Sequence, residues 1–289
     1  MYKFKPIVKT LVWGTERWIM SGVKGSESVV SEGPEAGKTL SEIFGGEFPL
    51  LIKFIDAHDD LSIQVHPNDE LAAKRHSCNG KTEMWYVTGA DKGAHLLSGF
   101  AKKLTPKQYD EAVQDGTIAE KLARYDVNEG DVFFLPAGRV HAICGGCHIA
   151  EIQQTSDITY RVFDYNRPGL DGKPRQLHTE LAKDAIDYTV LPDYRTAYEH
   201  DADAETVLVD CEYFTTSLFD LGKPYVKDLS KIATFYAVIC IKGSGRVSDG
   251  VSEYELAAGE SVLVPASCDK LSFVPSAGGF ELLTSFKRV

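Results

Sequence analysis

The stretch Gly130–His141 decides the fold, and it reads Gly-Asp-Val-Phe-Phe-Leu-Pro-Ala-Gly-Arg-Val-His. Val132–Leu135 is apolar and β-prone, which predicts one short buried strand. Pro136 ends that strand, and Gly138 allows the backbone to turn tightly. His141 then begins the next strand. We therefore predict a strand–turn–strand unit that directs one imidazole into the mouth of a β-barrel.

Three polar side chains upstream complete a candidate metal site with that imidazole. Gln64 and His66 lie two positions apart in Leu61–Pro67, where apolar and polar residues alternate as in a half-buried strand, so both face one side. Glu83 stands where the next strand, Met84–Val87, begins. Taken singly, each residue is more simply a surface or core polar side chain. Together, two imidazoles, one carboxylate and one amide suit a borderline divalent ion with an open position, although amides are poor zinc ligands.

Length and composition limit the possible classes of protein. The 289 residues exceed the usual size of one hydrophobic core and predict two domains. The net charge of −11 argues against nucleic acid and acidic membranes as partners. No stretch approaches the ~20 apolar residues that span a bilayer, and the first residues lack an apolar signal core. We therefore expect a cytoplasmic protein with no membrane partner.

The six cysteines are scattered, and a chain of this size does not need disulfides, so we expect reduced thiols. Cys144 and Cys147 form a Cys-x-x-Cys pair. The pair lacks a βαβ context, and no second pair completes a zinc site, so a redox or metal role is not expected there.

The chain contains an internal repeat. Tyr236–Gly243 matches the placement of Met84–Gly89, and Tyr254–Ala266 matches Tyr125–Ala137. Such a repeat predicts two barrels of similar pattern. The second copy keeps the Gly-x5-Pro spacing but has no Gly and His after it, and it lacks a Gln-x-His strand. We therefore expect the second barrel to be structural and metal-free.

The spacing Gly-x5-Pro-x-Gly-x2-His resembles the second motif of the cupin superfamily of small β-barrels. The predicted fold is mainly β, with two cupin-like, jelly-roll barrels. Residues 1–195 form a metal-binding domain with an N-terminal arm, and residues 205–289 form a degenerate metal-free domain. A helical insertion at about residues 102–125 is predicted from Thr105 as an N-cap, Pro106 at the first helical position, and a second short helix over Thr117–Arg124.

Three runs are similar to type I mannose-6-phosphate isomerase in its short bacterial form. They are Leu-Ser-Ile-Gln-Val-His-Pro from Leu61, Gly-Lys-Thr-Glu-Met-Trp-Tyr from Gly80, and Tyr-Arg-Val-Phe-Asp-Tyr-Asn-Arg from Tyr160. The resemblance extends from Trp13 to Arg167, with a weaker cupin-like tail. It implies a zinc-dependent enzyme, with one zinc per chain, that interconverts mannose 6-phosphate and fructose 6-phosphate.

The resemblance also implies roles for individual residues. The zinc ligands would be Gln64, His66, Glu83 and His141. The catalytic residues would be Arg161, Glu151 and Lys81, and the phosphate would be bound by Lys53, Ser62 and Arg161. The sequence departs from the family pattern at two positions, because Thr82 replaces a proline and Gly80 stands where some members carry a histidine proposed as the base.

Aldose–ketose isomerisation moves a proton between C1 and C2 through a cis-enediol, which zinc would stabilise as a Lewis acid. The proton needs a base, for which Glu151 or a zinc-bound water is our candidate. Simpler roles stay open for the cations. Arg161 can pair with Asp157 or Asp164, and the two lysines can pair with Asp56 or Glu83.

Two other functions compete with the isomerase. Two histidines and one carboxylate also describe the iron site of a cupin dioxygenase, although the cation set would then have no purpose. A non-catalytic cupin that binds a sugar phosphate is the second alternative. In each case the expected partner is a small molecule, and the chain is expected to be a monomer or a homodimer.

Overall fold

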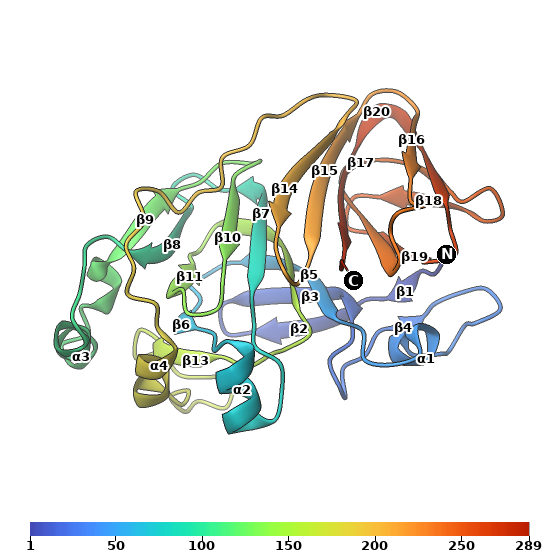
Figure 1. Ribbon diagram of the computed structural model, residues 1–289. Helices are drawn as coiled ribbons and strands as arrows, with labels where there is room; N and C mark the ends of the chain where they lie inside the picture. Colours follow the sequence, from blue (N-terminus) through green and yellow to red (C-terminus); the bar gives the residue numbers. More distant parts are fainter. Residues whose placement is uncertain (289) are drawn as a thin grey trace. The chain divides into compact units, whose positions relative to one another are not determined.

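The computed structural model describes residues 1–288 and is mainly β, as predicted (Figure 1). The chain divides into two compact units. The central unit contains Val8–Arg17 and Leu51–Thr196, and the terminal unit contains Met1–Ile7, Trp18–Leu50 and the described residues from Ala197 onward. The N-terminal arm, which we had placed wholly with the first domain, is thus divided between the two units.

Two antiparallel sheets, centred on the central unit, carry the four candidate ligands. The six-stranded sheet has the order β10-β7-β12-β5-β3-β2, and the five-stranded sheet has the order β13-β6-β11-β8-β9. The first contains β2 (Ile7–Leu11), β3 (Gly14–Ser21), β5 (Leu50–Ala57), β7 (Glu83–Ala90), β10 (Val132–Leu135) and β12 (Cys147–Gln154). The second contains β6 (Ile63–Val65), β8 (His95–Phe100), β9 (Leu122–Asp126), β11 (His141–Ile143) and β13 (Tyr160–Phe163).

Alternation along the strands divides the core of the central unit into two layers. Trp85 and Phe133 of the six-stranded sheet pack in one cluster with Leu96 and Ile143 of the five-stranded sheet. Residues of opposite parity, such as Leu97, belong to a second cluster that includes residues of α3 and α4. The five-stranded sheet is therefore covered on both faces, and Leu96 of β8 faces the other sheet.

Two helices of the central unit begin at side chains that cap them. Asn68 caps α2 (Asp69–His76), and Thr105 forms a capping box with Gln108 at the start of α3 (Pro106–Gln114). The turn of η1 (Ile118–Lys121) and the helix α4 (Thr179–Ala185) complete the set. Among the described residues, no helix combines the length and apolar character that crossing a bilayer would require.

The first helix of the insertion is confirmed, and the second is confirmed only for the turn of η1 (Ile118–Lys121) and wrong after it. Leu122–Asp126 forms strand β9, not the end of a helix over Thr117–Arg124. The segment pairs with β8 in register Leu96 with Tyr125. Residues 122–126 gain ladder hydrogen bonds by pairing with the edge of β8, and these stabilise a strand more than the local helix propensity stabilises a helix.

The terminal unit is built on one seven-stranded sheet. Its path is β14-β15-β20-β17-β18, with β16 also on β20 and β19 also on β17. The strands are β14 (Glu205–Asp210), β15 (Thr215–Leu221), β16 (Tyr225–Asp228), β17 (Phe235–Ser248), β18 (Glu253–Ala257), β19 (Ser261–Pro265) and β20 (Lys270–Phe286). The arm adds β1 (Phe4–Lys5), β4 (Val29–Val30) and α1 (Leu40–Phe44). The core contains Phe219, Tyr236 and Leu282.

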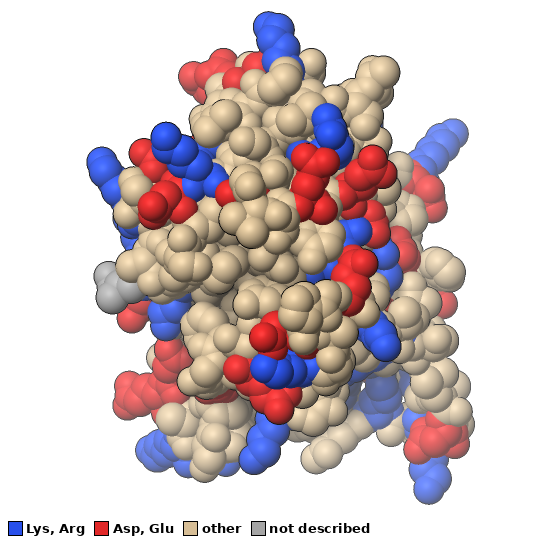
Figure 2. Space-filling view, turned by 90° about the vertical axis from the view of Figure 1, so that its right-hand side faces the viewer, with Lys and Arg blue, Asp and Glu red and all other residues tan. Residues whose placement is uncertain are grey.

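Charged side chains of both signs are interspersed on the face shown in Figure 2. The sequence has 42 acidic and 31 basic residues, and on this face the acidic side chains are not gathered into one patch. A small anion could approach such a surface wherever cations outnumber carboxylates locally.

Gly99 of β8 offers a test of the packing. It has φ +67°, and an added Cβ would lie 2.1 Å from Cζ of Tyr194. Tyr194 is held by its hydroxyl, which donates to the Phe100 carbonyl at 3.1 Å, so it cannot move away freely. We expect Gly99→Ala to lower the free energy of unfolding, measured with urea, by about 1–3 kcal/mol more than Gly93→Ala does.

Gly93 is the matched control because its φ is +88° and nothing lies within 4 Å of an added Cβ. It shares the backbone strain of Gly99 without the steric overlap. Equal losses of stability in the two variants would contradict the packing argument.

Candidate metal centre

The two sheets bring the predicted ligands to one place. Arg161 of β13 and His141 of β11 are both register partners of Gln64 on β6, which lies between them. Partners across an antiparallel ladder point to the same face, so these three side chains form one row directed at the six-stranded sheet. Glu83 is the first residue of β7 in that sheet, and His66 follows the last residue of β6.

Three of the four predicted ligands converge closely. His66, Glu83 and His141 each offer one ligand atom, and these atoms lie within 4.8 Å of one another. His141 Nε2 is 3.3 Å from Glu83 Oε1, and His66 Nε2 is 3.6 Å from Glu83 Oε2. All three residues are buried, with exposed fractions of 2%, 0% and 1%.

Backbone carbonyls orient both imidazoles. His66 Nδ1 lies 2.8 Å from the Ile158 oxygen, and His141 Nδ1 lies 2.8 Å from the Arg139 oxygen. Because a carbonyl can only accept, each Nδ1 carries the proton and each Nε2 presents its lone pair to the centre. This arrangement is typical of metal-ligating histidines.

The chemistry of the donor set fits a cation. Burial, with a further contribution from Lys81, lowers the pKa of His141 to about 3, and the pKa of His66 also lies well below its usual value, so both rings are neutral. Glu83 Oε1 is buried without a hydrogen-bond partner among residues 1–288. Burial and the nearby Glu151 charge raise the pKa of Glu83 to about 7. A divalent ion would supply the missing positive charge.

Gln64 is the least direct member of the set. Its Nε2 lies 3.4 Å from His141 Nε2, and its Oε1 accepts from the Ser62 hydroxyl at 3.2 Å. The two ends of an amide are interchanged by one side-chain flip, and a hydroxyl can accept as well as donate. With that flip the oxygen would face the centre, and Ser62 would still be bonded to the amide.

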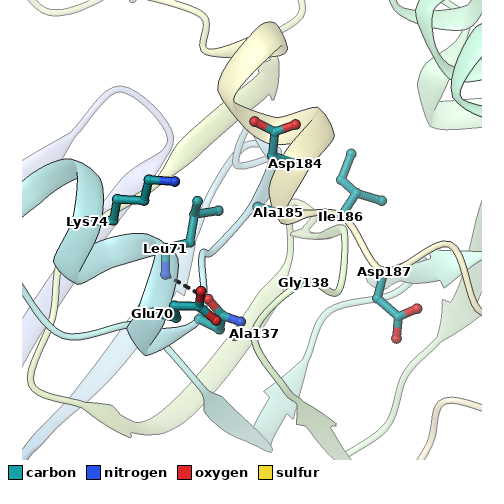
Figure 3. Close-up of a pocket in the computed structure, with 10 residues that line it drawn as sticks. Glu70, Leu71, Lys74, Ala137, Gly138, Asp184, Ala185, Ile186 and Asp187 are labelled. Atoms are coloured by element: carbon teal, nitrogen blue, oxygen red, sulfur yellow. Dashed lines mark hydrogen bonds between the residues drawn. The ribbon is translucent and has the colours of Figure 1, made fainter.

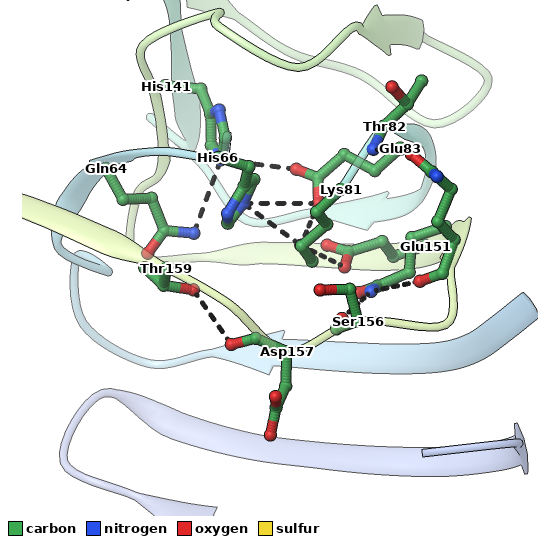
Figure 4. A network of polar contacts seen from close by, with 12 residues as sticks. Gln64, His66, Lys81, Thr82, Glu83, His141, Glu151, Ser156, Asp157 and Thr159 are labelled. Carbon is green, nitrogen blue, oxygen red and sulfur yellow. Dashed lines mark hydrogen bonds and ion pairs between the residues drawn. The ribbon is translucent and has the colours of Figure 1, made fainter. Parts of the chain in front are cut away.

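A buried chain of alternating charges lies beside the ligands, and its members Lys81 and Glu151 are labelled in Figure 4. Lys53 Nζ lies 3.2 Å from Glu16 Oε1 and 3.1 Å from Glu151 Oε1. Lys81 Nζ lies 3.4 Å from Glu151 Oε1 and 3.1 Å from His66 Nε2, and it also pairs with Glu83. Lys81 therefore makes the Glu83 pair that we had considered, whereas Lys53 pairs with Glu16 and Glu151 instead of Asp56.

Cations dominate the environment of Glu151. Burial by itself would raise its pKa, but Lys53 and Lys81 outweigh burial and lower the pKa to about 2. Trp85 also donates its Nε1–H to Glu151 Oε2 at 2.8 Å. Burial likewise opposes the charge of Lys53, yet the Glu151 and Glu16 carboxylates raise its pKa. The two lysines, and not burial, therefore decide the direction in which the pKa of Glu151 is shifted.

Arg161 is held by neighbours other than the two aspartates that we had considered. Its Nη1 donates to the Gln176 carbonyl at 2.8 Å, and its backbone N–H donates to His178 Nδ1 at 3.2 Å. Asp164 binds Arg167 and Arg175 instead. Arg161 Nε is buried with no hydrogen-bond partner within residues 1–288, so one donor of this guanidinium is available to a ligand.

Comparison with known proteins shows to which family the chain belongs. Residues 20–93 match the family model "Phosphomannose isomerase type I, catalytic domain", and residues 204–278 match "Mannose-6-phosphate isomerase, cupin domain". Mannose-6-phosphate isomerase ManA of Bacillus subtilis is 33% identical over 292 residues, covering 91% of this chain and 92% of the relative. The chain belongs to the type I mannose-6-phosphate isomerase family.

Two further comparisons agree with this membership. The mannose-6-phosphate isomerase of Streptococcus mutans is 33% identical over 282 residues, covering 93% of this chain and 87% of that protein. The crystal structure of the mannose 6-phosphate isomerase from Bacillus subtilis matches with a TM-score of 0.88 at 28% identity, and it covers 98% of both chains. The family is one of aldose–ketose isomerases.

The two departures from the family pattern have physical reasons in this chain. An added Cβ on Gly80 would lie 2.5 Å from the backbone of Asn68 and Asp69, so no side chain fits there. The Thr82 N–H donates to Gln154 Oε1 at 2.8 Å, and a proline would lack that donor. The local backbone thus excludes a histidine at position 80 and uses the amide at position 82.

A separate surface hollow of about 370 Å³ lies beside α2, α4 and the turn at Gly138 (Figure 3). Glu70, Lys74 and Asp184 are among its lining residues, and none of the four predicted metal ligands lines it. The turn itself supports the centre, since the Gly138 N–H donates to the His66 carbonyl at 2.9 Å. The hollow is therefore outside the metal centre of this isomerase-family chain.

Cys144 and Cys147 are free thiols that are both buried. Burial raises the pKa of Cys147 to about 11 and also raises the pKa of Cys144. The Cys147 thiol donates to the His95 carbonyl at 3.3 Å. A reactive thiolate is therefore disfavoured at this pair.

The first site prediction concerns metal content. His141→Ala removes one of three converging ligands, and we expect the variant to lose its bound metal, measured by elemental analysis of the purified protein. His148→Ala is the control, because His148 pairs with Asp56 near the surface and lies outside the cluster. Full metal occupancy in His141→Ala would refute the ligand assignment.

Proposed function

We propose that this protein interconverts mannose 6-phosphate and fructose 6-phosphate with one zinc ion per chain. The observation that carries the proposal is the buried His66–Glu83–His141 cluster, with an ionised Glu151 and two lysines beside it. Family membership supports the same reaction.

The residues that would hold zinc are His66, Glu83 and His141, with Gln64 as a fourth donor after the amide flip. Bound there, zinc would supply Lewis acidity that favours a cis-enediol by stabilising negative charge on the substrate oxygens. Neutral Nε2 donors and a carboxylate are the ligand types that zinc accepts, and three protein donors of this kind leave a position open.

Glu151 is the proposed base for the proton that moves between C1 and C2. With its pKa near 2 the group is ionised at neutral pH and can accept a proton, but it is then a weak base. Lys81 contacts both Glu151 and the ligand cluster. A substrate oxygen that draws the Lys81 ammonium toward itself would remove one cation from Glu151 and raise its basicity. We therefore assign Lys81 to the substrate oxygens and Glu151 to the proton.

Phosphate recognition was assigned to Lys53, Ser62 and Arg161. Lys53 is already balanced by two carboxylates, and the Ser62 hydroxyl is bonded to Gln64. Arg161 retains a buried Nε donor without a partner in the described chain, and its row faces the centre. We therefore propose that Arg161 carries most of the phosphate recognition, while Lys53 chiefly holds Glu151 in place.

The proposal is tested by assaying both directions of the reaction with the purified, metal-loaded protein. We expect kcat/KM for mannose 6-phosphate to exceed that for mannose, because only the phosphate ester engages the guanidinium. Arg161→Lys should reduce this preference by about 10²-fold or more, since a buried, hydrogen-bonded charge contact is worth roughly 3 kcal/mol. Arg124→Lys, on a surface ion pair, should leave it unchanged. Equal kcat/KM for the two sugars in the unaltered protein would contradict the proposal.

The role of Glu151 is tested separately. Glu151→Gln should retain metal and substrate binding but lose about 10²–10⁴ in kcat, the usual share of general base catalysis. Exchange of the C2 proton of bound sugar with solvent deuterium should fall in parallel. Glu120→Gln, an exposed change in the insertion, is the control. A near-normal kcat in Glu151→Gln would show that another group, and not Glu151, acts as the base.

The remaining expectations concern the cellular setting. A cytoplasmic protein that is a monomer or a homodimer, with no nucleic acid partner, stays a prediction. The same holds for the division of roles, with catalysis in residues 1–195 and a metal-free structural domain in residues 205–289.

A further inference from the structure

Another cavity lies in the terminal unit, and it is lined by none of the residues assigned to the reaction. Its volume is about 570 Å³, within the range of roughly 300–1,000 Å³ that is common for small-molecule sites. Its walls come from β14, β15, β16, the loop after β16, and the end of β20. The residues that matter here are Glu205, Thr215, Ser217, Lys227, Lys231 and Lys287.

The cavity is at the open end of the unit's own core. Thr215, Ser217, Phe219 and Leu221 alternate along β15 and therefore share one face. Phe219 and Leu221 belong to the hydrophobic core, so the two hydroxyls continue that inner face beyond the apolar filling. Phe286, the register partner of Thr215, also lines the cavity and stacks on the ring of Tyr236 at 6.1 Å.

Ser217 is the residue that points to a ligand. It is only 2% exposed, it lines the cavity, and its side chain makes no hydrogen bond within residues 1–288. Its neighbours are occupied, since Thr215 donates to Asp210 at 2.7 Å and Thr284, opposite Ser217, accepts from Tyr236 at 2.9 Å. The Ser217 hydroxyl is therefore available to bond to a ligand that enters the cavity.

The charge of the lining is positive although the whole protein is acidic. Four cations, Lys227, Lys231, Lys287 and Arg288, face two carboxylates, Glu205 and Asp228. Lys227 pairs with Glu205, and Arg288 pairs with Asp210. Lys231 and Lys287 make no ion pair within the described chain, and Asp228, which lies near Lys231, offsets one of them, so one positive charge at this cavity is uncompensated.

We propose that this cavity of the terminal unit binds a small anion that carries hydroxyl groups, of the chemical class of a phosphorylated sugar alcohol. The excess positive charge attracts the anionic group. The inner hydroxyl of Ser217 donates to a ligand oxygen, and the Thr215 hydroxyl, whose proton is bound by Asp210, accepts from a ligand hydroxyl, while the ring of Phe286 packs against the carbon chain. No histidine or cysteine lines the site, and its residues are not those of the His66–Glu83–His141 cluster, so it binds without performing the reaction of the central unit.

The test uses the full chain and the probe D-glucitol 6-phosphate, which cannot be isomerised. Hydrogen–deuterium exchange with and without the probe separates the two units by peptide. We expect slower exchange in peptides that cover residues 205–217 and 225–233. Ser217→Val, which replaces the hydroxyl by a methyl group and fills space, should abolish that protection while protection near residues 141–161 persists.

Controls distinguish this site from general effects. Ser272→Ala removes a hydroxyl from the opposite face of β20 and should keep the protection, because Leu271 and Phe273 are the core-facing neighbours. Lys231→Gln should weaken probe binding several-fold, whereas Lys223→Gln, outside the cavity, should not. Glucitol or inorganic phosphate that protects these peptides as well as the probe does would overturn the assignment, as would no protection at all. Failure of this test leaves the turnover assay untouched, so the two proposals fail separately.

Discussion

The buried attraction between Glu151 and two lysines is the interaction on which the rest of the central unit depends. A carboxylate and two ammonium groups inside a protein are each costly alone, and removing one partner of such a set typically costs about 3–5 kcal/mol. Two further contacts stabilise these buried charges: Glu16 is a second carboxylate beside Lys53, and Trp85 donates an N–H to Glu151. Its geometry holds Lys81 beside His66 and Glu83. The ion pairs that balance the buried charges therefore also position the metal ligands.

The two histidines depend on a different kind of support. Their Nδ1 protons are bound by carbonyls of the loop before β13 and of the turn before β11, so the tautomer is set by backbone and not by other side chains. The turn at Gly138 connects the two histidine segments, because Gly138, which lies just before His141, donates its N–H to the His66 carbonyl. The Gly138 carbonyl in turn accepts from the Asp187 N–H. Gly138 has φ +93°, and an added Cβ would lie 2.9 Å from the Ala185 carbonyl, which explains the glycine in the Pro-x-Gly motif.

Motif spacing predicts the ligand set, and strand alternation places only Gln64 and His66 on one face. By alternation Trp85 could have been added to the site, since it stands two residues after Glu83 on the same strand. Glu16 could not, because only the pairing of distant strands brings it to Lys53. Strand β9 was predicted wrongly for the same reason, since the edge of β8 decides its conformation and the local pattern does not.

The two copies of the repeat show how one pattern can serve two purposes. In both, apolar residues of alternating strands fill a core, and the open end of that core is left to polar side chains. In the first copy the polar end contains imidazoles and a carboxylate, whose lone pairs converge on one point and demand a cation. In the second copy it contains hydroxyls and two carboxylates outnumbered by four cations, a lining that fits the anion proposed for it. On this proposal the polar ends of the two copies bind ligands of opposite charge, and a copy without the metal motif still has a polar end that can bind.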